Sequence, residues 1–144
     1  MEPLHYLDKI SFNDVDVKSN IRERKRIKEW IKTTISSENK LCGTIDYNFC
    51  SDEKLLEINN EFLKHDYYTD IITFDLTEKN IISGDIYISL PRVKDNSKTH
   101  DTSYIGELNR VLIHGVLHLC GYKDKTKKDT IQMREKEDYY LSLL

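Results

Sequence analysis

The sequence predicts an α+β fold in which four short strands are interspersed with helices. Three observations support this prediction. The chain has 144 residues, of which 38% are hydrophobic and 33% charged, and this suits one compact globular domain spanning residues 1–144. Several short segments alternate apolar and polar residues, as half-buried strands do. Longer segments repeat apolar residues at intervals of three and four, which is the pattern of helices with one buried face.

Charge and hydropathy exclude several classes of protein. The net charge of −3 gives no basic surface over the whole chain, so any RNA contact requires a local basic patch. No apolar run approaches the ~18 residues of a membrane span, and the start of the chain lacks the pattern of a secretory signal. We therefore expect a cytoplasmic protein without membrane contact, whose three cysteines are free thiols.

The first half of the chain predicts two strands and two helices. A short strand lies near residues 10–12, and a helix covers about 21–37. The polar side of this helix is rich in Lys and Arg; it could touch RNA, but such a face is more often simply solvated. Residues 43–50 alternate apolar and polar side chains at positions 45–49 and predict the second strand. Ser51 is then placed to cap the second helix.

The middle of the chain predicts two further strands, at about 70–76 and 84–90. The connection between them is short enough for adjacent antiparallel pairing. Pro91 ends the second of these strands, because proline cannot donate a ladder hydrogen bond. The polar residues 92–101 predict a loop or a short helix.

Two helices are predicted in the last third of the chain. Thr102 or Ser103 can cap a helix that continues to about Leu119. Thr126, followed three residues later by an aspartate, predicts a capped final helix to about Leu143.

The segment that carries chemistry is the stretch HGVLHLCGYKD. Residues 111–119 are apolar on nearly every side, so their helix should be buried. His114 and His118 share one face of that helix, with Cβ atoms ~5–6 Å apart. Buried ring nitrogens need partners, and a divalent ion would satisfy both. Gly121 can take the left-handed conformation that ends a helix, so that Asp124 turns back toward the histidines. This predicts a metal site at the end of a buried helix, with His114, His118 and Asp124 as ligands.

Simpler interpretations exist for the same residues. The two histidines could bond backbone carbonyl groups, and Asp124 could be a solvated loop carboxylate or the cap of the final helix. Zinc peptidases with paired histidines place a general-base glutamate directly after the first one. Gly115 occupies that position here, which argues against a peptidase. The missing side chain of Gly115 is expected to keep an approach to the metal open.

Taken together, the segments resemble the YbeY family of metal-dependent, single-strand endoribonucleases of ribosomal RNA maturation. HGVLHLCGYKD is similar to the family pattern His-Gly-x-Leu-His-Leu-x-Gly-Tyr-Asp-His. Upstream, YTDIITFDL is similar to its Thr-Asp-Val-Leu-Ser-Phe segment, and SGDIYISL to its Gly-Asp-Ile strand. The resemblance covers roughly residues 45–140. It implies a small mixed sheet of about four strands packed with helices, and one Zn²⁺ or similar divalent ion per chain held by the motif.

Two positions depart from the family pattern. The third histidine of the family falls on Asp124, and a carboxylate is also an ordinary zinc ligand. An arginine beside an upstream aromatic residue falls on Leu63, which removes a natural phosphate clamp. Lys64 and His65 could substitute for it, or could be surface charges at a helix end. The candidate substrate-binding residues are Lys64, His65, Arg92 and Arg110.

The resemblance implies a single-strand-specific, metal-dependent endoribonuclease that acts in ribosomal RNA processing and ribosome biogenesis. Its partners would be single-stranded or ribosomal RNA, and further the small ribosomal subunit and ribosome-associated proteins. No residue of the motif is an obvious general base. One alternative is a non-catalytic ribosome-assembly or RNA-binding factor with a structural metal; another is a metal-dependent hydrolase of a different phosphoester or amide. An open coordination position facing a groove would favour an enzyme, and a fourth protein ligand a structural site.

Overall fold

The computed structural model describes residues 8–144, and the start of the chain, on which the expectation about a secretory signal rests, lies mostly outside this range. Within it the chain forms four strands and five helices. No described helix has both the length and the apolar character that a membrane crossing requires. In chain order the elements are β1 (Lys9–Asp14), α1 (Arg24–Ser37), β2 (Leu41–Cys50), α2 (Asp52–Leu63), β3 (Ile71–Asp75), β4 (Ile81–Ser89), α3 (Leu90–Thr99), α4 (Tyr104–Leu119) and α5 (Lys127–Leu141).

The four strands form one mixed sheet in the order β1-β2-β4-β3. Strand β2 pairs in parallel with β1 on one side and with β4 on the other. Strand β3 lies at the edge and pairs with β4 in the antiparallel sense, as the short connection between them predicts. The α+β fold with a small mixed sheet is therefore confirmed.

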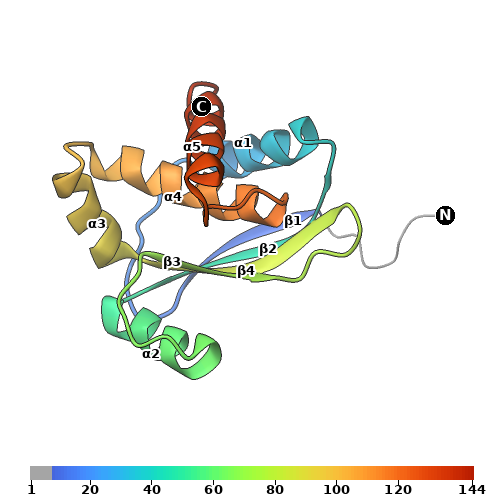
Figure 1. The fold of residues 1–144 in the computed structure, drawn as a ribbon. Helices are drawn as coiled ribbons and strands as arrows, with labels where there is room; N and C mark the ends of the chain where they lie inside the picture. Colours follow the sequence, from blue (N-terminus) through green and yellow to red (C-terminus); the bar gives the residue numbers. More distant parts are fainter. Residues whose placement is uncertain (1–7) are drawn as a thin grey trace.

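Helices cover both faces of this sheet. In Figure 1, α1, α4 and α5 lie over one face and α2 lies under the other, with α3 beside one end. The larger hydrophobic core fills the space between the sheet and α1, α4 and α5, and a smaller one lies between the sheet and α2. The fully buried side chains of the larger core include Ile31, Ile35, Ile45, Tyr47, Ile86, Leu112, Ile113 and Leu117.

Helix α4 is the central helix, and the sequence predicts it well. The Ser103 hydroxyl accepts a hydrogen bond from the Gly106 N–H at 2.9 Å, which caps the helix at the predicted position. A Cβ added at Gly115 would lie 3.0 Å from Cδ1 of Ile86 and 3.2 Å from Cδ1 of Ile71. Gly115 therefore faces the sheet and allows close helix–sheet packing. The expectation that it keeps an approach to the metal open was wrong.

Other helix ends follow local signals. The Ser51 hydroxyl accepts from Lys54 N–H, and the Thr126 hydroxyl from Asp129 N–H, so both predicted caps are confirmed. The polar segment after β4 is a full helix, α3, in which Pro91 occupies the first turn. Proline is tolerated there because the first N–H groups of a helix have no partner within it.

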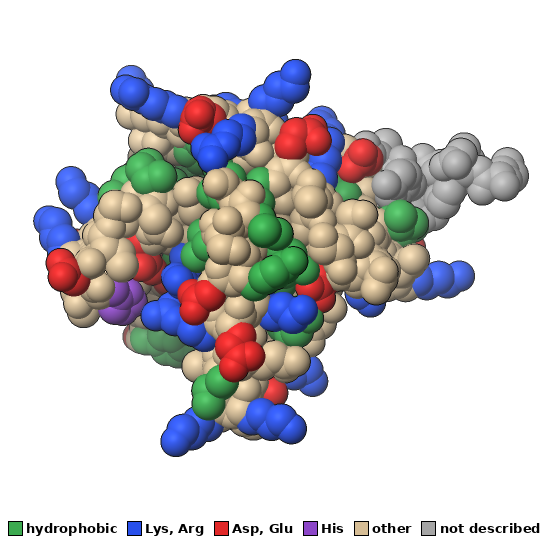
Figure 2. Space-filling model, turned by 90° about the horizontal axis from the view of Figure 1, so that it is seen from above, with side chains coloured by type: hydrophobic (Ala, Val, Ile, Leu, Met, Phe, Trp, Pro, Cys, Tyr) green, Lys and Arg blue, Asp and Glu red, His purple; other side chains and the backbone are tan. Residues whose placement is uncertain are grey.

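The helical face of the molecule carries charges of both signs. Figure 2 shows Lys and Arg side chains interspersed with Asp and Glu over this surface. The mixture agrees with the small net charge of −3. It leaves selective binding to local features rather than to one large basic surface.

Candidate metal centre

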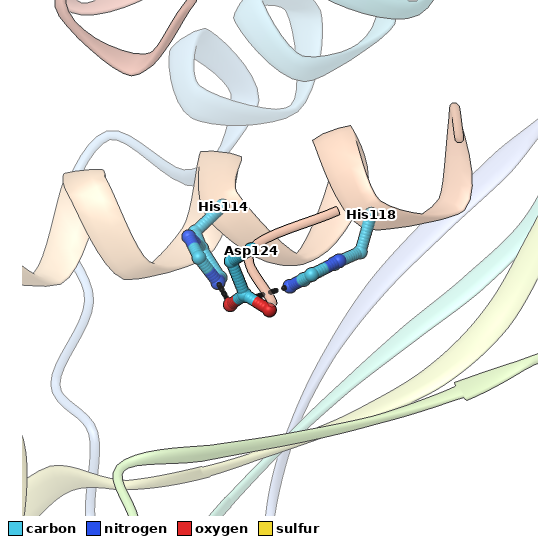
Figure 3. Close-up of side chains that lie close together, drawn as sticks. All are labelled: His114, His118 and Asp124. Atoms are coloured by element: carbon cyan, nitrogen blue, oxygen red, sulfur yellow. Dashed lines mark hydrogen bonds and ion pairs between the residues drawn. The ribbon is translucent and has the colours of Figure 1, made fainter. Parts of the chain in front are cut away.

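Both histidines of the motif lie on one side of the last turns of α4. Figure 3 shows them projecting toward the same point, with Asp124 between them. Their ring centroids are 4.6 Å apart, and the rings are inclined at 83°. The His114 and His118 side chains are 21% and 27% exposed, so solvent reaches the site from one side.

The second nitrogen of each ring is already held by the protein. Nδ1 of His118 donates to the Tyr122 carbonyl oxygen at 2.9 Å. Nδ1 of His114 lies 2.6 Å from Oε2 of Glu137. A proton on each Nδ1 leaves the lone pair of each Nε2 directed at the common point, which is the arrangement of metal-binding histidines. The alternative in which the histidines bond backbone carbonyl groups thus holds for Nδ1 of His118. The other nitrogen, Nε2, remains able to bind a metal ion.

The turn after α4 brings Asp124 to the histidines. Gly121 has a φ of 110°, a conformation that glycine adopts without strain, and the Tyr122 N–H donates back to the Leu117 carbonyl oxygen at 3.0 Å. Oδ2 of Asp124 then lies 3.3 Å from Nε2 of His114 and 3.2 Å from Nε2 of His118. The cap of α5 is Thr126, so the alternative in which Asp124 caps this helix was wrong.

These three side chains form a donor set that fits a divalent metal ion. One atom from each of His114, His118 and Asp124 lies within 4.8 Å of the other two. Two imidazole nitrogens and a carboxylate oxygen are ordinary ligands of zinc and related ions. In residues 8–144 no further His, Cys, Asp or Glu joins the group. Cys120 is close in sequence but does not belong to this group, and burial raises the pKa of its thiol to about 12.

Glu137 of α5 supports the site, and the sequence interpretation missed it. Its side chain is 6% exposed, and Oε1 accepts from Nη1 of Arg110 at 2.7 Å while Oε2 holds His114. Burial raises the pKa of Glu137, but the hydrogen bonds from His114 and Arg110 outweigh it and lower the pKa, so the carboxylate is charged. The signal was available: Met133, Glu137 and Tyr140 form the buried face of α5, where a glutamate is out of place.

Replacing Glu137 by glutamine should weaken metal binding about tenfold or more, because the charged carboxylate fixes the His114 ring and makes it a better donor. The measurement is a zinc titration against a competing chelator. Asp138→Asn is the matched control, since Asp138 bonds Arg110 at 2.7 Å and has no bond to either histidine. Equal metal affinities of the Glu137→Gln protein and the parent would contradict the supporting role of this carboxylate.

The candidate metal centre opens into a groove of about 1160 Å³. The walls come from α4, α5, β3, the end of α2 and the two loops that follow α2 and α4. Among the predicted substrate-binding residues, His65 and Arg110 lie on this groove, whereas Lys64 and Arg92 do not. Further polar residues on the groove include Asn59, Tyr67, Thr69, Asp70, Lys125 and Arg134.

The sequence of the chain matches a family of known proteins. A family model described as Endoribonuclease YbeY matches residues 9–144. The chain belongs to the YbeY family. Among curated relatives, the Endoribonuclease YbeY of Cytophaga hutchinsonii is 51% identical over 135 residues, covering 93% of this chain and 94% of the relative. That of Parabacteroides distasonis is 47% identical over 135 residues, covering 94% and 95%.

A solved structure shares the fold of this YbeY family member. The solution structure of TM1509 from Thermotoga maritima superimposes with a TM-score of 0.66 at 27% sequence identity. The match covers 92% of this chain and 86% of TM1509. The overall fold of this chain is thus shared by a separately determined structure.

The departures from the YbeY pattern can now be placed. Leu63, at the position of the usual arginine, lines the groove and adds no charge. Arg92 is bound elsewhere: its guanidinium bonds the Asp52 carboxylate at 2.5 and 3.2 Å and lies over the Tyr68 ring. Lys64 ends α2 in a left-handed conformation. The positive charge of Lys and Arg side chains on the groove comes instead from Arg110 and from two residues that were not predicted, Lys125 and Arg134, beside several carboxylates.

Proposed function

We propose that residues 1–144 form one YbeY-like domain that acts as a single-strand-specific, metal-dependent endoribonuclease in ribosomal RNA processing and ribosome biogenesis. One observation carries the proposal: His114, His118 and Asp124 converge in a groove that is open to solvent. The curated relatives named Endoribonuclease YbeY support RNA as the substrate. Ribosomal RNA in the small subunit, with its associated proteins, is the proposed target.

We further propose one Zn²⁺ per chain at the three side chains, although another divalent ion would fit the same donors. When bound, such an ion supplies Lewis-acid stabilisation of charge on the phosphodiester and a water of lowered pKa. The protein's part is to hold the donors in place. Glu137 fixes His114, and the Tyr122 carbonyl fixes His118.

Cationic side chains of the groove would position the RNA backbone. Arg110 is held between Glu137 and Asp138, at 2.7 Å from each, so its guanidinium has a fixed orientation. The Arg134 side chain is mostly exposed, and it lies 3.7 Å from Glu137. Lys125 and the exposed Arg134 supply further cations for phosphate groups on the same groove.

Asp70 is a carboxyl group of the groove whose pKa is raised. It precedes β3 and lines the groove. Burial raises the pKa of Asp70, more than the nearby His114 lowers it. A carboxyl group with a raised pKa exchanges protons closer to neutral pH, as general acids and bases require.

The alternative, a binding factor with a purely structural metal, has less support. A structural zinc site is closed by four protein ligands. In the described part of the chain the group has three, and the Asp124 side chain is 43% exposed. This arrangement leaves room for a substrate at the candidate metal centre.

Metal removal tests the proposal directly. Purified protein should cleave a labelled single-stranded RNA, lose this activity after dialysis against a chelator, and regain it with one equivalent of Zn²⁺ per chain. Duplex RNA of the same sequence is the control and should be cleaved much more slowly. Isolated small ribosomal subunits form a further arm, which tests the ribosomal target. Cleavage at the full rate in metal-free protein would contradict the proposal.

A further inference from the structure

We propose that His65 and Tyr67 form a stacking platform that binds one unpaired nucleobase of the RNA beside the candidate metal centre. The proposal rests on the proposed function and names the feature that selects single-stranded substrate. It concerns the loop between α2 and β3, which carries none of the three proposed metal ligands.

The two rings are stacked on each other. Their centroids are 5.1 Å apart, and the planes are inclined by only 20°. The Tyr67 hydroxyl and Nδ1 of His65 are joined by a hydrogen bond of 3.0 Å. Tyr67 is nevertheless 56% exposed, and His65 is also exposed. An ordered, stacked aromatic pair is thus exposed to solvent.

The buried residue Asn59 holds this loop in place through two hydrogen bonds. Asn59 is 2% exposed, and its Nδ2 donates to the Tyr67 carbonyl oxygen at 3.0 Å. The carbonyl oxygen of Asn59 accepts from the His65 N–H at 3.1 Å. One buried residue therefore holds the backbone of both platform residues. Such preorganisation lowers the entropy lost when a ligand binds.

The position of the platform indicates its ligand. His65 and Tyr67 line the same groove as His114, His118 and Asp124. A strand whose phosphate lies at the candidate metal centre must place neighbouring bases along this groove. Single-stranded RNA is typically recognised by stacking of splayed bases on aromatic side chains, whereas bases in a duplex are already stacked. A platform of this kind would therefore favour single strands.

The neighbouring Tyr68 differs from Tyr67 because an arginine side chain already lies over its ring. The Arg92 guanidinium lies 5.1 Å from the centroid of Tyr68, and Arg92 is itself fixed by Asp52. Tyr68 is also absent from the lining of the groove. It is therefore a natural control for an exposed tyrosine of the same loop that does not bind a base.

The test compares binding of two probes by fluorescence anisotropy, with zinc-loaded full-length protein. One probe is a short single-stranded RNA with non-cleavable linkages, and the other is the same strand with abasic ribose units. The parent should prefer the base-containing strand. Tyr67→Ala should weaken binding of that strand roughly tenfold to a hundredfold and leave the abasic strand unaffected. Tyr67→Trp should restore the preference, and Tyr68→Ala should retain it.

Two further measurements keep this test separate from the proposed function. Tyr67→Leu keeps apolar bulk without an aromatic face, so it should bind zinc like the parent yet lose the preference for bases. Cleavage assays report on the proposed function, whereas the ratio of the two affinities reports on the platform even if no cleavage is seen. An unchanged ratio in both Tyr67→Ala and Tyr67→Leu would overturn the proposal.

Discussion

Replacement of His114 by alanine is expected to reduce RNA cleavage to less than about one-hundredth of the parent rate. Loss of an outer partner of a metal-binding histidine already costs about 10–100-fold in affinity or activity, and His114 would be a direct ligand. The substitution also leaves the buried Glu137 carboxylate without its histidine partner at 2.6 Å. The measurements are the cleavage rate of single-stranded RNA and the zinc content by elemental analysis.

His100→Ala is the matched control for this substitution. His100 lies at the end of α3, is exposed, and contacts Glu107 rather than the candidate metal centre. It should therefore retain both zinc and activity. If His114→Ala cleaved RNA as fast as the parent, the activity would belong to a contaminating nuclease or to a different site.

Much of the fold could be predicted because its signals are local. The helix caps at Ser51, Ser103 and Thr126 bond N–H groups three residues away, so sequence alone locates them. The alternation in residues 43–50 likewise depends only on which face of a strand is buried. The antiparallel pairing of β3 and β4 followed from a short connection.

The features that could not be predicted depend on packing between distant segments. Glu137 meets His114 only because α5 crosses α4, and 23 residues separate the two. Arg92 is removed from the groove by Asp52, which lies 40 residues earlier. The role of Gly115 is set by Ile86 and Ile71 of the sheet beneath it. A linear pattern does not contain these contacts, so residue type alone gave the wrong role for Gly115.

Substitution of Asp124 distinguishes between two interpretations of this residue, a metal ligand and a loop carboxylate without a role in metal binding. Asp124→Ala should weaken zinc binding by more than about 100-fold, since two imidazoles alone would remain to hold the ion. Asp124→His should retain the ion, because imidazole suits the same metals. The geometry favours this outcome, as Oδ2 lies at 3.3 and 3.2 Å from the two Nε2 atoms.

A loop carboxylate predicts a different result for the same variants. Asp124 does not cap α5, because the Thr126 hydroxyl has that role. In that case Asp124→Ala would remove only a weak ion pair with the two histidines. Such a pair contributes about 0–1 kcal/mol to stability at an exposed site. Titration of zinc against a competing chelator distinguishes the two cases, with Asp129→Ala as a control on the same segment. If Asp124→Ala bound zinc as tightly as the control, Asp124 would lie outside the coordination sphere, and the two histidines would need a ligand from the substrate or from water.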